Sequence, residues 1–94
     1  MVRFEWHLQK AVQNLGKHVV SFDEATTVFN DPLARIFDDP DHSITEAREI
    51  IVGHSIAGRL IMASFVEKEP GLVRIISARL TTNKERADYE ENLC

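Results

Sequence analysis

The chain has 94 residues, of which 44% are hydrophobic and 28% charged, and its formal net charge is −4 at pH 7. These values are ordinary for a folded protein and exclude an intrinsically disordered chain, which has too few apolar residues to form a core. The length lies at the lower end of the usual domain size and predicts a single domain over residues 1–94.

Cysteine content and apolar runs bear on the compartment. The single cysteine, Cys94, excludes an intramolecular disulfide and indicates a reducing compartment. The longest apolar run is residues 60–63, whereas a membrane-spanning helix needs about 20 residues. The first residues also lack the basic and then apolar layout of a secretory signal. We therefore expect a cytoplasmic protein with no membrane partner.

The charge is divided into blocks along the chain. Residues 21–46 carry seven acidic residues against one arginine, whereas residues 47–86 carry seven Lys and Arg against four Glu. Nucleic-acid phosphates bind clustered Lys and Arg, so the second half can form a local phosphate site on an acidic molecule. The alternative is that these charges are solvated strand edges and turns.

Two helices are predicted first. Apolar residues recur over residues 8–15 at the i, i+3, i+4, i+7 spacing of an amphipathic helix, and Gly16 is expected to end it in a left-handed conformation. A capping box over residues 21–24 begins a second helix, because a serine hydroxyl and a glutamate three residues later can exchange hydrogen bonds with the backbone. Pro32 ends that helix.

Four strands and a last helix are predicted next. The strands are residues 33–37, 49–55, 59–67 and 73–78, with a loop over residues 38–43 and turns at 56–58 and 70–71. A second capping box at residues 82–85 opens a short helix through Tyr89. This order predicts an α+β fold in which two N-terminal helices and a short C-terminal helix pack on a four-stranded antiparallel sheet.

The sequence contains no motif typical of a metal site, of a cofactor site or of a catalytic nucleophile. The four histidines are His7, His18, His42 and His54, and their spacings match no recognised metal site. The glycines are isolated, so no phosphate-binding glycine loop is present, and no serine lies in a nucleophile elbow. We expect neither a metal nor a cofactor.

The candidate chemistry that remains is the binding of phosphate groups by arginine side chains. With strict alternation along the last strand, Ser77 and Arg79 project to one face and Arg74 to the other. A guanidinium stays charged and forks onto phosphate oxygens, so it can stabilise the phosphorane that forms when an RNA 2′-hydroxyl attacks its own phosphate. Such cleavage also needs a general base and a general acid but no metal. The alternative for each such residue is a surface ion pair or a helix cap.

The chain resembles the BrnT toxins of bacterial type II toxin–antitoxin modules, whose fold is similar to that of the RelE ribonucleases. The resemblance rests on an ordered series of short matches at matching spacing: Phe4-Glu5-Trp6, Lys10-Ala11, Asn14, Lys17-His18, Val20-Ser21-Phe22, Glu24-Ala25, Phe29, Asp31-Pro32, Glu46, Arg48, Gly53, Gly58-Arg59, residues 74–79, Glu85-Arg86 and Tyr89-Glu90.

The resemblance implies a metal-independent ribonuclease toxin that cleaves RNA and thereby inhibits translation. It also implies neutralisation by a BrnA-type protein antitoxin, with promoter DNA bound only indirectly through the antitoxin. Carried over to this sequence, the candidates are Arg79 and Arg48 as phosphate stabilisers, His18 as base or acid with Glu46 as its alternative, and Arg59, Ser77 and Tyr89 for substrate contact.

This sequence departs from the family pattern at two positions. Val19 stands where the family usually has glycine after the Lys-His pair, and a β-branched residue is strained if that position needs positive φ. His7 stands where an acidic residue usually caps the first helix, which costs about 1 kcal/mol.

Two other functions stay open at this stage. One is a catalytically inactive, toxin-like scaffold that binds an antitoxin in an autorepressor complex. The other is the related ParE-like line, whose members have a similar architecture and poison gyrase, although the match at residues 4–6 and 17–18 speaks against it.

Overall fold

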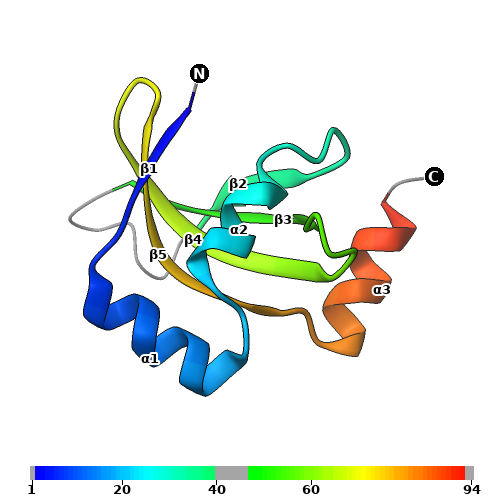
Figure 1. Cartoon of the computed structure of the whole chain (residues 1–94). Helices are drawn as coiled ribbons and strands as arrows, with labels where there is room; N and C mark the ends of the chain where they lie inside the picture. Colours follow the sequence, from blue (N-terminus) through cyan, green and yellow to red (C-terminus); the bar gives the residue numbers. More distant parts are fainter. Residues whose placement is uncertain (1, 40–46, 93–94) are drawn as a thin grey trace.

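The computed structural model describes residues 2–39 and 47–92 and shows an α+β fold (Figure 1). Its elements are β1 (Arg3–Glu5), α1 (Leu8–His18), α2 (Phe22–Val28), β2 (Arg35–Asp38), β3 (Arg48–His54), β4 (Leu60–Glu69), β5 (Leu72–Leu80) and α3 (Asn83–Glu91). The predicted helices and strands are present, with bounds shifted by one to three residues. None of the described helices is long and apolar enough to cross a membrane.

The sheet has five strands in the order β1-β5-β4-β3-β2. The prediction of a four-stranded, wholly antiparallel sheet is therefore wrong, because β1 adds a fifth strand that runs parallel to β5, with Phe4 opposite Val73. The other three pairings are antiparallel. A strand of three residues is too short to show an alternating pattern, and its partner lies almost 70 residues away, so only the folded chain reveals it.

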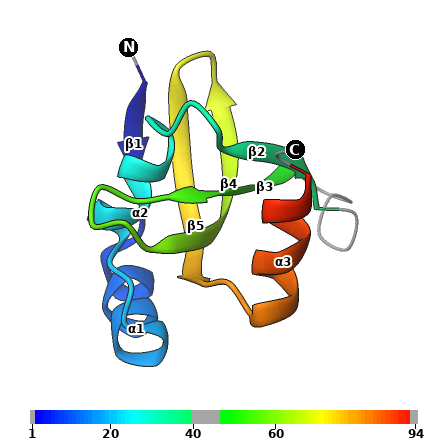
Figure 2. The same cartoon turned by 90° about the vertical axis from the view of Figure 1, so that its right-hand side faces the viewer.

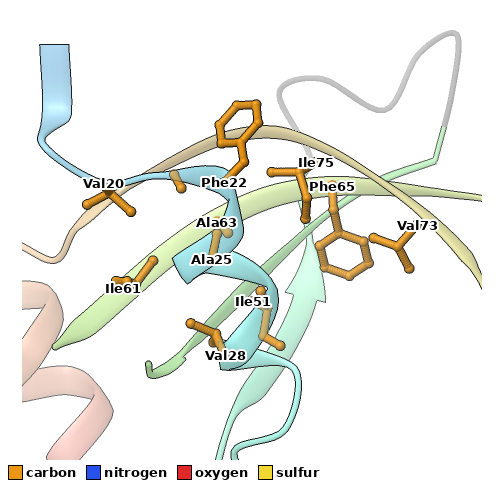
Figure 3. Close-up of a cluster of buried hydrophobic side chains, with 11 residues drawn as sticks. Val20, Phe22, Ala25, Val28, Ile51, Ile61, Ala63, Phe65, Val73 and Ile75 are labelled. Carbon is orange, nitrogen blue, oxygen red and sulfur yellow. The ribbon is translucent and has the colours of Figure 1, made fainter. Parts of the chain in front are cut away.

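Helices cover the sheet on both sides. Helices α1 and α2 lie on one face and α3 lies on the other (Figure 2). The main core forms between α2 and the sheet, where Phe22, Ala25 and Val28 pack against residues such as Ile61 and Ala63 (Figure 3). All five side chains are buried. The second face is only partly covered by the short α3, which leaves room for a cavity there.

Three of the four residues in the apolar stripe of α1 face solvent, and only Ala11 packs against the main core. Leu8, Val12 and Leu15 are 76%, 65% and 50% exposed. The helix docks instead through Asn14, whose buried side-chain amide donates to the carbonyl oxygens of Val20 and Ala78, at 2.9 and 2.8 Å, and whose Oδ1 accepts from the Ala78 N–H at 3.0 Å. The periodicity correctly predicted a helix, but a polar residue supplies its buried contact.

The C-terminal end of α1 also differs from the prediction. The helix continues through Gly16 to His18, and the left-handed residue is Val19, with φ 57° and ψ 31°. Val19 thus meets the condition stated above, under which a β-branched residue is strained. At the other end, His7 makes no side-chain capping bond, which agrees with the expectation of a poor cap.

The two predicted capping boxes have different outcomes. At α3 the box is complete, since Thr82 and Glu85 exchange both hydrogen bonds. At α2 only half of it forms: the Ser21 hydroxyl accepts from the Glu24 N–H at 3.0 Å, whereas the Glu24 carboxylate binds Arg59. Arg59, which directly precedes β4, competes with the helix N-terminus for that carboxylate.

Candidate active site on the α3 face of the sheet

A cavity of about 420 Å³ lies on the sheet face opposite α1 and α2. Alternate residues of β3, β4 and β5 build its floor, because neighbouring side chains of a strand point to opposite faces and the others enter the main core. The lining residues are Asp39, Arg48, Ile50, Met62, Ser64, Ile76, Ser77 and Arg79. Three residues predicted from the sequence, Arg48, Ser77 and Arg79, therefore meet around one cavity.

A β-bulge in β5 decides which arginines share this face. The pairing moves from Ser64 opposite Ser77 to Phe65 opposite Ile75, so Ile76 is an extra residue. Consistent with this shift, Ile75 and Ala78 both enter the main core although they are three residues apart. The prediction that Arg74 projects away from Arg79 is wrong, because the bulge breaks the strict alternation on which it relied. Arg74 binds Glu5 of β1, with 2.6 Å between Nε and Oε2.

The strand register places Arg48 and Arg79 at two ends of the cavity. Arg48 is opposite Val66 of β4, and Arg79 is opposite Met62 of the same strand. Their Cα atoms are offset by two inter-strand spacings across the sheet and by the rise of four residues along the strands, which together give a separation of about 16 Å. Ser64 lies midway between Val66 and Met62, and its Oγ is buried without a hydrogen-bond partner among the described residues. A hydroxyl without a partner, placed between two guanidinium groups, is suited to contact a bound anion.

Arg79 is held in place by α3. Its Nη1 and Nη2 donate to the two carboxylate oxygens of Glu85 at 2.7 and 2.8 Å. This bidentate pair lowers the pKa of Glu85 to about 2 and raises the pKa of Arg79. The Arg79 side chain is 38% exposed, so the pair lies at the rim of the cavity rather than inside the core.

His18 does not line this cavity. It lies at the end of α1 beside a separate hollow of about 170 Å³, whose other lining residues are Lys10, Gln13, Asn14, Lys17 and Ile76. Ile76, the extra residue of the bulge, lines both spaces. The structure therefore places the predicted base in a separate hollow that shares only Ile76 with the lining of the arginine cavity.

The remaining predicted residues lie elsewhere. Arg59 makes a bidentate ion pair with Glu24 and donates to the carbonyl oxygen of Val19 at 3.0 Å, and this arrangement lowers the pKa of Glu24. Tyr89 is buried, its hydroxyl donates to the carbonyl oxygen of Leu33 at 3.0 Å, and burial raises its pKa. Both side chains bind elements of the fold together. Glu46 lies outside the described residues.

Two cavity residues were missed by the sequence prediction. Ser64 lies in the middle of an apolar strand, and nothing in its local pattern distinguishes it from any solvent-facing serine. Asp39 belongs to a run of acidic residues that suggested a loop, yet it is buried and its N–H donates to the carbonyl oxygen of Arg48 at 3.0 Å. No signal in the sequence pointed to either position, because both depend on cross-strand neighbours.

The polar side chains that line the cavity are two arginines, two serines and the carboxylate of Asp39. Residues 2–39 and 47–92 contain no group of three or more His, Cys, Asp or Glu side chains that could hold a metal ion. The two arginines can balance negative charge, and the two serines can donate hydrogen bonds to anionic oxygens. Such a lining fits a phosphodiester better than an apolar ligand.

Comparisons with known proteins bear on the family of the chain. A model of the family described as ribonuclease toxin, BrnT, of type II toxin-antitoxin system matches residues 6–85. The crystal structure of the ribonuclease toxin BrnT of Brucella abortus is similar to the chain, with a TM-score of 0.69 and 18% sequence identity over 88% of this chain and 100% of that one. No curated protein sequence matches the chain. Because the family match spans most of its length, the chain belongs to the BrnT family of ribonuclease toxins of type II toxin–antitoxin systems.

Proposed function

We propose that this toxin cleaves RNA without a metal ion, in the cavity on the α3 face of the sheet. The 2′-hydroxyl of one nucleotide attacks the adjacent phosphorus, so that a 2′-O–P bond forms while the P–O5′ bond breaks. The products are a 2′,3′-cyclic phosphate and a 5′-hydroxyl. A general base takes the 2′-hydroxyl proton, and a general acid protonates the departing 5′-oxygen.

Arg48 and Arg79 balance the extra negative charge on the phosphorane, and Ser64 and Ser77 donate hydrogen bonds to its oxygens. The observation that carries the proposal is that both arginines line one cavity from opposite ends. His18 and Glu46 are the candidates for proton transfer, and Glu46 precedes Arg48 by two residues in the chain. Arg59 and Tyr89 take no part in this scheme, because each is bound within the fold.

The proposal extends to the partner and the cellular effect. Membership of a type II system implies a protein antitoxin, and we assign it to the BrnA type. In the cytoplasm the free toxin cleaves RNA and inhibits translation, and the bound toxin reaches promoter DNA only through the antitoxin. The RelE-like relationship of the fold belongs to the same proposal.

The test uses the purified full chain and an RNA oligonucleotide in the presence of EDTA. We expect cleavage that leaves 2′,3′-cyclic phosphate ends, and a loss of about 10²- to 10³-fold in kcat for Arg79→Ala and for Arg48→Ala. Arg3→Ala is the matched control, because Arg3 of β1 forms an exposed ion pair with Glu69 of β4 and does not line the cavity. Cleavage that requires an added divalent metal, or wild-type rates in both cavity variants, would refute the mechanism.

A non-catalytic scaffold is the second candidate. It is favoured by one observation, namely that the terminal nitrogens of Arg79 are all engaged by protein acceptors. On this reading the chain binds its antitoxin but cleaves no RNA. Co-expression with the neighbouring antitoxin gene, together with the cleavage assay, separates the two: complex formation without any cleavage supports the scaffold.

A further inference from the structure

The Arg79–Glu85 pair links the candidate active site to α3. Arg79 is on β5, where it lines the cavity, and Glu85 is in the first turn of α3. Glu85 also borders a second hollow of about 300 Å³ beneath α3, and Met62 lines both spaces. The ion pair and Met62 therefore form the wall between the two.

The hydrogen bonds of Arg79 leave one edge of the guanidinium for a ligand. Nη1 donates to Glu85 Oε1 and to the carbonyl oxygen of Leu80, at 2.7 and 3.2 Å. Nη2 donates to Glu85 Oε2 at 2.8 Å and to the thioether sulfur of Met62 at 3.2 Å. Among the described residues, no acceptor binds Nε, and a thioether is a weak acceptor. A phosphate that displaces the Met62 sulfur can therefore bind the edge formed by Nε and Nη2 through two of its oxygens.

Glu85 is itself fixed on its far side. Its Oε1 accepts from the backbone N–H of Thr82 at 2.8 Å, and the Thr82 hydroxyl accepts from the backbone N–H of Glu85 at 3.1 Å. This capping box orients the carboxylate before any substrate arrives. A carboxylate held in this way restrains the guanidinium in turn, because a bidentate pair fixes the plane as well as the position of the arginine.

We propose that Glu85 is a positioning residue, which holds the terminal edge of Arg79 so that the Nε–Nη2 edge is presented to the phosphate. The inference rests on the proposed function, since it assigns Arg79 to the reacting phosphate. It gives α3 a role in catalysis although its own residues do not touch the substrate. It also explains why the guanidinium is paired at the rim of a cavity without being buried.

The experiment measures steady-state RNA cleavage with Glu85→Gln, Arg79→Ala, the double variant and Ser21→Ala. Glu85→Gln retains an oxygen for the Thr82 N–H but loses the charge that restrains Arg79. We expect kcat to fall about 10- to 100-fold with little change in KM, as for a misplaced catalytic group. Ser21→Ala is the matched control: it removes the N-cap hydrogen bond of α2, on the other face of the sheet, and lowers Tm, while it keeps the Arg79–Glu85 ion pair and the wild-type kcat.

The double variant separates positioning from a structural role. If Glu85 acts only through Arg79, Glu85→Gln has no further effect on kcat in the Arg79→Ala background. A wild-type or higher kcat in Glu85→Gln overturns the inference, the higher value indicating that the carboxylate competes with the phosphate. A further loss of kcat in the double variant also overturns it. If Arg79→Ala itself cleaves at the wild-type rate, the proposed function fails at this residue, which is a different result.

Discussion

Replacing Val19 with glycine is expected to stabilise the protein. Val19 has φ 57° and ψ 31°, a left-handed conformation that costs an L-residue about 1–2 kcal/mol, with β-branched residues at the upper end. Glycine relieves this strain but loses about 0.5–1 kcal/mol through the greater freedom of the unfolded chain. Since the Val19 side chain is 67% exposed, its removal loses only about 0.5 kcal/mol of burial.

The net gain in unfolding free energy is about 0.5–1 kcal/mol, which raises Tm by roughly 3–6 °C in a domain of this size. Thermal unfolding followed by circular dichroism measures it. Val12→Gly is the matched control, because Val12 is 65% exposed and lies within α1, where glycine is unfavourable. The same substitution should therefore lower Tm at Val12 and raise it at Val19.

A lower Tm for Val19→Gly would refute the reasoning, because the left-handed conformation would then carry no strain that glycine can relieve. An equal decrease in both variants would show that the loss of side-chain contacts dominates at each position. In either case the corner after α1 would owe its geometry to something other than the backbone preference of Val19.

Three further outcomes are expected. Asn14→Ala should lower the unfolding free energy by about 3–5 kcal/mol, because it leaves two buried carbonyl groups and the Ala78 N–H without their partner. Urea titration measures this change, and an effect below about 1 kcal/mol would contradict the prediction. The difference in unfolding free energy between wild type and Glu85→Gln should be about 1–2 kcal/mol near pH 7. It should shrink from about pH 5 down to pH 2, because a carboxylate with a pKa near 2 loses its stabilising charge as the pH falls through that range. A difference that stays constant with pH would argue against the ion pair. Ser64→Ala should keep or raise Tm, because it removes a buried hydroxyl that has no partner among the described residues. The same variant should raise the KM for RNA several-fold, and an unchanged KM would remove Ser64 from the site.

The sequence determined the local structure of this protein. The caps at Ser21 and Thr82, the turn at Gly71 and the apolar strands all act over a few residues, so their patterns predicted the three helices and four of the five described strands. The left-handed residue after α1 was predicted at Gly16 and lies at Val19, so the pattern located the end of the helix only to within three residues. The candidates Arg48, Ser77 and Arg79 came from the resemblance to the BrnT family rather than from local patterns.

Only the tertiary structure decided how these pieces meet. The bulge at Ile76 places Arg74 and Arg79 on one face, and the short β1 joins a partner almost 70 residues away. The outward-facing stripe of α1 shows that periodicity predicts a helix but not which of its faces is buried, since the hydrogen bonds of Asn14 dock it. The roles proposed for Ser64 and Glu85 depend in the same way on neighbours from other strands and helices, which the spacing of residues in the sequence does not encode.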